Sequence, residues 1–269
     1  MKIAKKAAVL AAGASVVLLS ACGEEQLPED VYKQSIEEME QIDSVYFTHS
    51  DTLSAEQQTV SSFARGAVQY DEPLQAYIES NMNVIDVNEA VELDFRVNGD
   101  DVEVRENKEW EDHDTNADEL QPLIKPTEDM RFFLEFEDEF LMKEEEEYYE
   151  VSFKGTDERH VSLVEKKLQS LGVIDGDGLG EEEQSSIQLD RIDMAAYINK
   201  DDMRLRGYDS RFTFTIELAG ELQTFNETSS VRYDDYNEAE GDLETFIEEK
   251  IKEIQQEQMQ AEEEEDNEE

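Results

Sequence analysis

The sequence predicts an α+β protein: one large antiparallel sheet with helices gathered on one of its faces. Two observations support this prediction. Apolar and charged residues alternate in two long regions on either side of a helical middle, as is typical of strands with one buried and one solvated face. Other stretches repeat apolar residues every three or four positions, which indicates amphipathic helices. A sheet with helices on one face buries all of these apolar sides together.

The first element is a helix expected over about residues 30–43, where acidic residues separate the apolar ones. The apolar positions that repeat at helical spacing are Tyr32, Ile36, Met39 and Ile42.

The first region of strands opens at Val45 and Phe47. A strand is expected over Thr59–Tyr70, with Gly66 as a bulge or bend. Pro73 then begins the strand Leu74–Ile78.

The strongest strand signal is Val91–Val97, in which apolar and charged residues alternate strictly. Asn98-Gly99 follows, and then Val102–Arg105. Asn-Gly favours a tight hairpin turn because both residues tolerate positive φ. We expect one face of this hairpin to be buried and the other to be wet.

The middle of the chain is predicted to hold two helices separated by a strand at Tyr148–Phe153. The first begins near Thr127, which can cap it, and Gly172 ends the second. Apolar residues of the first helix are Met130, Phe133, Leu134, Phe140 and Leu141, and those of the second are Val161, Val164, Leu168 and Leu171.

Strands then return at Ile192–Ile198 and Arg211–Leu218, with turns at Asn199–Asp202 and Ala219-Gly220. Further strand segments are expected at Leu222–Asn226 and Val231–Tyr233, followed by a final amphipathic helix with apolar residues from Leu243 to Ile254. That helix runs into Glu257–Glu269, which is almost all acidic and is expected to be disordered.

The N-terminus has the pattern of an export signal. Lysines precede the small and apolar run Ala7–Ala21, which is short for a membrane-spanning helix. Leu19–Cys22 resembles the lipobox of bacterial lipoproteins, which implies a diacylglyceryl group on Cys22 and cleavage between Ala21 and Cys22. Two acyl chains give durable membrane anchoring. The alternatives are an ordinary cleaved signal with a coincidental cysteine, or an uncleaved anchor helix.

The charge balance is strongly acidic. The chain has 71 acidic and 23 basic residues, a net charge of −48. Removal of residues 1–21 takes away three lysines and no acid, so 20 basic and 71 acidic residues remain, a net charge of −51. Salt weakens such repulsion, since the screening length falls from about 10 Å at 0.1 M to about 3 Å at 1 M. We therefore expect a protein of saline or alkaline surroundings, and one that does not bind nucleic acid.

The lipobox, the first helix, the Pro73–Ile78 strand, the hairpin at Asn98-Gly99 and the strands of Arg211–Asn226 together resemble the LolA/LppX-like lipoproteins. More closely, the chain is similar to an uncharacterised family of Gram-positive surface lipoproteins of that fold. This resemblance implies a curved, half-open barrel with helices packed on its concave face, where an acyl chain or lipid can lie. The resulting division is a signal peptide at 1–21, a tether at 22–30, the α+β domain at 31–236, and a C-terminal helix with acidic tail at 237–269.

Catalytic motifs are absent from the sequence. His49, His113 and His160 are far apart, none lies beside a nucleophile motif, and each is interpreted as a surface or capping histidine. Asp175–Glu181 imitates the start of a calcium loop, but Leu179 and Ser186 stand where oxygen ligands are needed. The preferred interpretation is a glycine-rich connector, so no enzyme activity, metal or cofactor is expected.

An aromatic cluster suggests a ligand-binding role. Its members, Phe132, Phe133, Phe136 and Phe140, are more than one narrow helical stripe needs. They either pack against the sheet or partly line a groove for lipid. We therefore expect a membrane-anchored, extracytoplasmic, non-enzymatic lipoprotein that binds or carries a hydrophobic ligand. The alternative is an envelope interaction module with a filled core and an acidic, cation-attracting surface.

Overall fold

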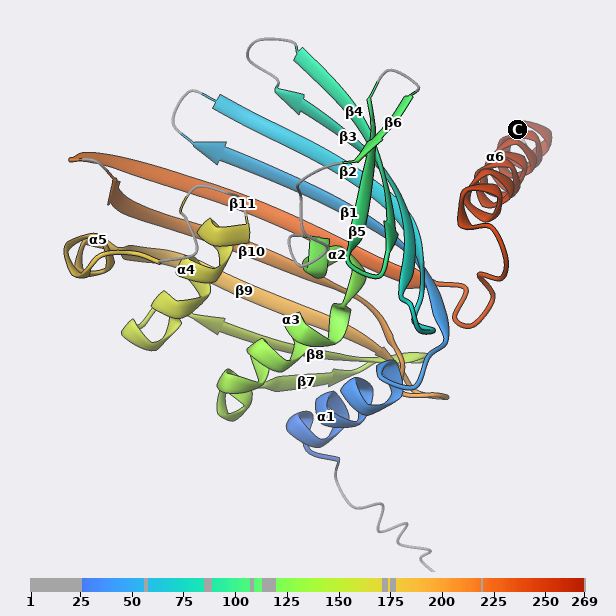
Figure 1. The fold of residues 1–269 in the computed structure, drawn as a ribbon. Coiled ribbons are helices and arrows are strands. Elements are labelled where there is room, and N and C mark those ends of the chain that lie inside the picture. The colour runs from blue at the N-terminus through green and yellow to red at the C-terminus, as the bar shows by residue number, and fades with distance from the viewer. Residues whose placement is uncertain are drawn as a thin grey trace, which may run out of the picture.

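A computed structural model describes residues 26–55, 58–84, 89–106, 109–112, 120–170, 174, 178–218 and 220–268. Its centre is one 11-stranded sheet in the order β6-β5-β4-β3-β2-β1-β11-β10-β9-β8-β7 (Figure 1). The strands are β1 (Ser44–Ala55), β2 (Gln58–Gln69), β3 (Gln75–Val84), β4 (Glu89–Asn98), β5 (Asp101–Glu106), β6 (Glu109–Asp112), β7 (Leu141–Glu144), β8 (Tyr148–Gly155), β9 (Gln188–Asn199), β10 (Leu205–Leu218) and β11 (Glu221–Asp234).

Helices precede, interrupt and follow the strands. They are α1 (Pro28–Met39), α2 (Gln121–Ile124), α3 (Pro126–Phe133), the 3₁₀ helix η2 (Leu134–Glu139), the 3₁₀ turn η3 (Glu158–His160), α4 (Val161–Ser170), α5 (Glu181–Ser186) and α6 (Leu243–Glu268).

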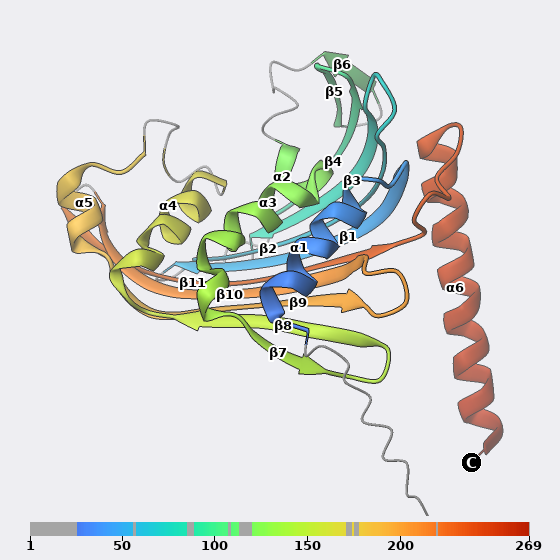
Figure 2. The ribbon, with the colours of Figure 1, turned by 90° about the horizontal axis from the view of Figure 1, so that it is seen from below.

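The sheet consists of two meanders that meet at its centre. Strands β1 to β6 run outward to one edge, and β7 to β11 run inward from the other edge, so that β1 pairs with β11. All neighbouring strands are antiparallel. The sheet is curved, with α1 to α4 on its concave side and α6 on the convex side (Figure 2). The predicted fold class is therefore confirmed, including the helices on the concave face.

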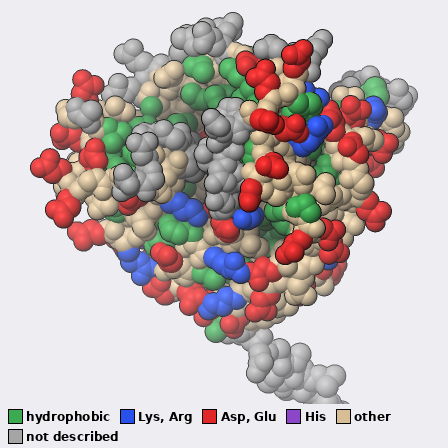
Figure 3. Space-filling view, viewed as in Figure 1, with side chains coloured by type: hydrophobic (Ala, Val, Ile, Leu, Met, Phe, Trp, Pro, Cys, Tyr) green, Lys and Arg blue, Asp and Glu red, His purple; other side chains and the backbone are tan. Residues whose placement is uncertain are grey.

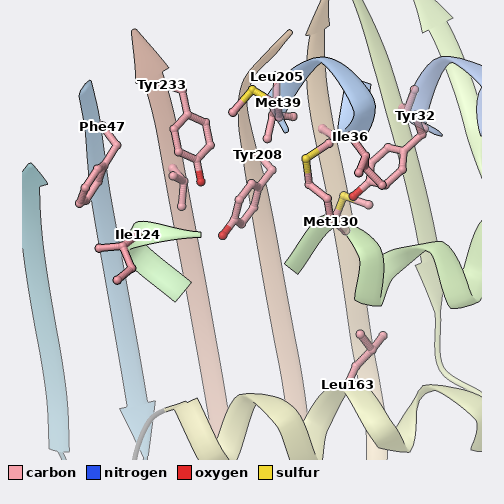
Figure 4. Packing of buried hydrophobic residues seen from close by; sticks show 14 of the residues in the cluster. Tyr32, Ile36, Met39, Phe47, Ile124, Met130, Leu163, Leu205, Tyr208 and Tyr233 are labelled. Carbon is pink, nitrogen blue, oxygen red and sulfur yellow. The ribbon is translucent and has the colours of Figure 1, made fainter. Parts of the chain in front are cut away.

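The main core lies between the concave face and the helices. Phe47, Phe153 and Phe214 of the sheet are each no more than 1% exposed, and they belong to the same buried cluster as Tyr32 of α1 and Met130 of α3. Figure 4 shows part of this cluster, including Tyr208 and Tyr233 from neighbouring strands. Each large apolar side chain buried in this way contributes about 1.5–3 kcal/mol, so the helices are held mainly by this layer.

Helix α6 packs on the convex face, away from the main core. Ile247 is completely buried there, in a second cluster that includes Tyr77. Glu244 of α6 accepts hydrogen bonds from Arg96 at 2.9 Å and from Arg105 at 2.7 Å. Helix α6 therefore takes no part in covering the concave side of the sheet.

The acidic segment that was expected to be disordered is helical in the structure, because α6 continues through Glu268. Elsewhere acidic side chains are spread over the surface, as Figure 3 shows for the face seen in Figure 1. The excess of negative charge is thus a property of the whole fold and not of its C-terminal segment alone.

The middle helix is shorter than predicted. Pro126 occupies its first turn, where the fixed φ of proline fits, so Thr127 lies inside the helix and caps nothing. The α-helix ends at Phe133, and Phe140 and Leu141 lie beyond the 3₁₀ helix that follows. Within that 3₁₀ helix Phe136 has a non-helical backbone (φ −113°), and its side chain is only 2% exposed.

The hairpin of β4 and β5 is confirmed, with the turn shifted by one residue. Asn98 pairs with Asp101, so the loop is Gly99-Asp100, and Gly99 has a φ of +62°. Burial on the apolar face is graded: Val97 is 1% exposed, whereas Val91 at the other end of β4 is 41% exposed. The concave wall is therefore open toward that end.

Gly66 causes neither a bulge nor a bend in β2, since the pairing with β1 and β3 continues through it without a shift. A Cβ at this position would lie 2.7 Å from the Tyr77 carbonyl oxygen and 2.8 Å from the Phe47 ring. The glycine is needed for this close approach. The edge strands β6 and β7, of four residues each, were not predicted.

Candidate functional site

A band of polar residues crosses the concave face of the sheet at its centre. In the strand register, Asp51 of β1 lies opposite Ser62 of β2 and Ser229 of β11, and Ser229 lies opposite Ser210 of β10. Because register partners share a face of the sheet, the four side chains form one row, which we call the polar band. Asp51, Ser229 and Ser210 are each 7–8% exposed.

The polar band forms the floor of a cavity of about 350 Å³ between the sheet and the helices. Its walls are largely apolar. They include Phe132 and Phe133 from α3, Leu163 from α4, and Phe212 and Met82 from the sheet. A pocket of this size with mostly apolar walls and a few convergent polar groups suits a small amphipathic ligand.

The phenylalanines of the middle segment divide between two roles. Phe132 and Phe133 line the cavity. Phe136 and Phe140 instead stack on Phe153 of β8, with ring centroids 5.4 Å and 6.1 Å apart. Of the two alternatives offered by the sequence, the lining of a groove applies to Phe132 and Phe133, which line a cavity. Packing against the sheet applies to Phe136 and Phe140.

One ionic cluster joins α4 to the polar band. The ammonium of Lys167 contacts the carboxylate of Glu227 on β11, and its Nζ lies 3.6 Å from Asp51 Oδ1. The Glu227 side chain is fully buried. Burial raises the pKa of Glu227 to about 8, with a further rise from Asp51, although Lys167 opposes both. Burial acts to lower the pKa of Lys167, but Glu227 and Asp51 together raise it above its ordinary value.

A second ion pair lines the cavity on its helical side. Lys166 Nζ lies 2.8 Å from Asp129 Oδ1 and 4.2 Å from the centroid of the Phe132 ring. The Tyr208 hydroxyl donates to the same carboxylate at 3.2 Å. Burial, followed by the charge of Asp129, raises the pKa of Tyr208 well above its ordinary value, so it stays a neutral donor.

His49 is part of this site, and its interpretation as a surface or capping residue is wrong. It lies in β1, a central strand, lines the cavity, and its Nε2 is 2.8 Å from Ser229 Oγ. Burial lowers the pKa of His49 although Asp51 partly opposes this, so the ring is neutral at pH 7. His49 is two residues from Phe47, and side chains two apart on a strand lie on the same face. This spacing was the signal in the sequence that His49 faces the interior.

His160 has a structural role in the turn before α4. Its Nδ1 lies 3.0 Å from Asp157 and its Nε2 3.2 Å from Glu139, so both ring nitrogens have partners. The ligand atoms of these three residues lie within 4.8 Å of one another, a spacing that a metal ion would also accept. The ring is completely buried and stacks on Phe136 at 5.1 Å. It is a capping residue, because its Nδ1 accepts from the Asp157 backbone N–H at 3.3 Å in a capping box.

Several predicted features lie outside the described residues: Ala21, Cys22, His113 and Asp175–Asp177. Of the suggested calcium loop, Leu179 is described, is 8% exposed and packs in the main core. Among the described helices, none combines the length and the apolar character that crossing a membrane requires.

Comparison with known proteins returned solved structures but no match among curated proteins. The chain is similar to the lipoprotein LppX of Mycobacterium tuberculosis, with 13% identity over 80% of this chain and 97% of that chain and a TM-score of 0.41. It is similar to LprF of Mycobacterium bovis, with 10% identity, coverage of 80% and 95%, and a TM-score of 0.42. A LolA superfamily protein of Nitrosomonas europaea gives 8% identity, coverage of 78% and 93%, and a TM-score of 0.23. Residues 28–241 match a family of unknown function, DUF6612, and the chain belongs to that family.

Proposed function

We propose that this protein is a non-enzymatic binding lipoprotein on the extracytoplasmic face of a membrane, and that it holds a hydrophobic ligand between its sheet and its helices. The cavity of about 350 Å³ carries this proposal. It lies within the range of about 300–1,000 Å³ that is typical of small-molecule sites. Each ligand methylene that leaves water for the apolar walls contributes about 0.8 kcal/mol to binding.

The position of the cavity supports a carrier role. Phe132 and Phe133 are only half-buried although they belong to a helix that packs on the main core. Beyond them the concave wall continues as an open apolar surface, with Met82 43% exposed and Val91 41% exposed. An apolar ligand would cover these side chains, which otherwise face water.

The proposed membrane attachment is through a diacylglyceryl group on Cys22, after removal of residues 1–21. It is supported by the basic N-terminus, the apolar run and the lipobox-like Leu19–Cys22. The first helix begins at Pro28, a few residues after that cysteine. The binding domain would therefore be tethered close to the membrane surface.

The alternative function, an envelope interaction module with a filled core, receives less support. It requires the space between sheet and helices to be filled by side chains, whereas His49, Asp51 and Phe132 face a cavity there. The acidic surface fits either function, because it only requires that the surroundings supply cations or salt.

The test is organic extraction of the full-length protein, purified from membranes, followed by mass spectrometry of the extract. A lipid present in stoichiometric amount is expected. Ser62→Phe places a ring in the cavity and should remove that lipid, whereas Ser61→Phe, on the next residue of β2 and the opposite face, should retain it.

Circular dichroism of both variants establishes that they are folded. The absence of any lipid from the unsubstituted protein, or equal lipid in folded Ser62→Phe and Ser61→Phe, would show that the cavity is not the binding site.

A further inference from the structure

The cavity and the ion cluster behind its floor together hold an unequal number of positive and negative groups. Asp51 and Glu227 share the single ammonium of Lys167, while Lys166 and Asp129 form a balanced pair beside them. Within the described part of the chain, three carboxylates against two ammonium groups leave a net charge of −1 when all are ionised. The neutral ring of His49 does not change this balance.

The two carboxyls that carry this excess charge when ionised lie where water has little access. Glu227 is 1% and Asp51 8% exposed, and Asp51 Oδ1 makes no hydrogen bond within the described part of the chain. Two buried carboxylates that share one ammonium are incompletely compensated, so a site of this kind either takes up a proton or binds a cation. Asp51 lines the cavity, so a cation there can reach its carboxylate.

The charge of the whole protein acts in the same direction. The net charge of −48 attracts cationic molecules and repels anionic ones before they reach the cavity. Both lysines of the cavity are already paired with carboxylates, so they provide little attraction for an anionic ligand.

We propose that the ligand is an amphiphile whose polar end carries one positive charge, a quaternary ammonium or a protonated amine. This end lies against Asp51, which shares Lys167 with the buried Glu227 behind it, and the chain lies along Phe132, Phe133 and Phe212. The inference rests on the proposed function, because it names the class of molecule that the same cavity takes.

Binding of such a ligand should release a proton. The titratable groups that act on Glu227 are Lys167 from α4 and Asp51 from β1. Those that line the cavity beside Asp51 are His49 from β1, Tyr208 from β10, Asp129 from α3 and Lys166 from α4. Burial is the main cause that places the pKa of Glu227 at about 8, so this carboxyl is protonated in the empty site at pH 7. A bound ammonium favours the ionised form. Affinity for a permanently charged ligand therefore rises with pH up to about 8 and is constant above it.

The experiment is isothermal titration of the full-length protein, stripped of lipid, with three probes below their micellar concentrations: decyltrimethylammonium, decyl sulfate and 1-decanol. At pH 8, decyltrimethylammonium should bind most tightly and decyl sulfate most weakly. Between pH 6 and pH 8, the affinity for decyltrimethylammonium should rise by up to about tenfold per pH unit, as expected for release of one proton. The affinity for decanol should not change.

Glu227→Gln should abolish this rise and lower the preference for the cation over decanol. Asp51→Asn provides a second variant with the same expected loss of preference. Glu150→Gln, on a convex-face position of β8, is the matched control and should behave as the unsubstituted protein.

Equal or tighter binding of decanol or decyl sulfate at pH 8 would overturn the inference while leaving the cavity as a hydrophobic site. A cation affinity that is independent of pH, or unchanged in both cavity variants, would also overturn it. If none of the three probes binds, the inference and the proposed function fail together.

Discussion

Glu227→Gln should raise the free energy of unfolding relative to the unsubstituted protein, and this difference should grow as the pH rises. The pKa of Glu227 is about 8 in the folded protein, compared with an ordinary value of 4.5, because the carboxyl is buried on β11 beside Asp51. Between these two values the folded state binds a proton that the unfolded state releases. Folding therefore becomes less favourable with rising pH, by about 1.4 kcal/mol per pH unit.

The size of the effect follows from these two pKa values. This difference in pKa lowers the free energy of unfolding only slightly near pH 4.5. The loss grows with pH and reaches a ceiling of about 5 kcal/mol above pH 8. Glutamine has nearly the same shape and no charge at any pH, so Glu227→Gln removes this loss. The free energy of unfolding of the variant minus that of the unsubstituted protein should therefore increase by about 4 kcal/mol between pH 5 and pH 8.

The assay is urea denaturation at pH 5, 6, 7 and 8, followed by circular dichroism and by the fluorescence of Trp110, the one tryptophan of the chain. Titration of the other acidic residues is common to both proteins and cancels in the difference. Glu150→Gln on the convex face provides the control for a glutamate-to-glutamine change. A difference that does not vary with pH would mean that Lys167 keeps Glu227 ionised, and the reasoning would be refuted.

Three further predictions concern the anchor, a glycine and the surface charge. Cys22→Ala should move the protein from the membrane fraction to the medium, or leave its signal uncleaved; an unchanged membrane fraction on immunoblotting would contradict the lipid anchor. Gly207→Ala should lower the free energy of unfolding by about 3 kcal/mol, because Gly207 has a φ of +153° and a Cβ would collide with the Val231 carbonyl oxygen. Gly220→Ala, at a φ of +84° with nothing within 4 Å of the added Cβ, should cost only about 1 kcal/mol, and equal losses in urea denaturation would refute this comparison. The melting temperature should rise by several degrees between 0.1 M and 1 M sodium chloride, because the net charge of −48 is then screened within about 3 Å instead of about 10 Å; a flat response in differential scanning calorimetry would contradict it.

The regular parts of the fold could be predicted because their signals are local. Alternation in Val91–Val97 and Arg211–Leu218 marks strands, and the structure places both segments within strands. The edge strands were missed for the same reason: four residues such as Glu109–Asp112 are too few to show a period. The position of Pro126 was a local signal that favoured a helix start one residue before Thr127.

The site could not be predicted because its residues come together only through the register of the strands. Ser62, Asp51, Ser229 and Ser210 belong to four strands, and Ser62 and Ser229 are far apart in the sequence. A shift of one residue in any pairing would send a side chain to the other face of the sheet. Lys167 meets Glu227 only because α4 folds back over this row.

The two ends of the strand order bear on how this protein behaves at high concentration. A long exposed edge is a template on which a second chain can add its own strand and begin a fibril. Here both margins are four-residue strands with charged side chains, Glu109–Asp112 and Leu141–Glu144. We therefore expect molecules at high local density to remain separate, because their edge strands do not favour pairing between sheets.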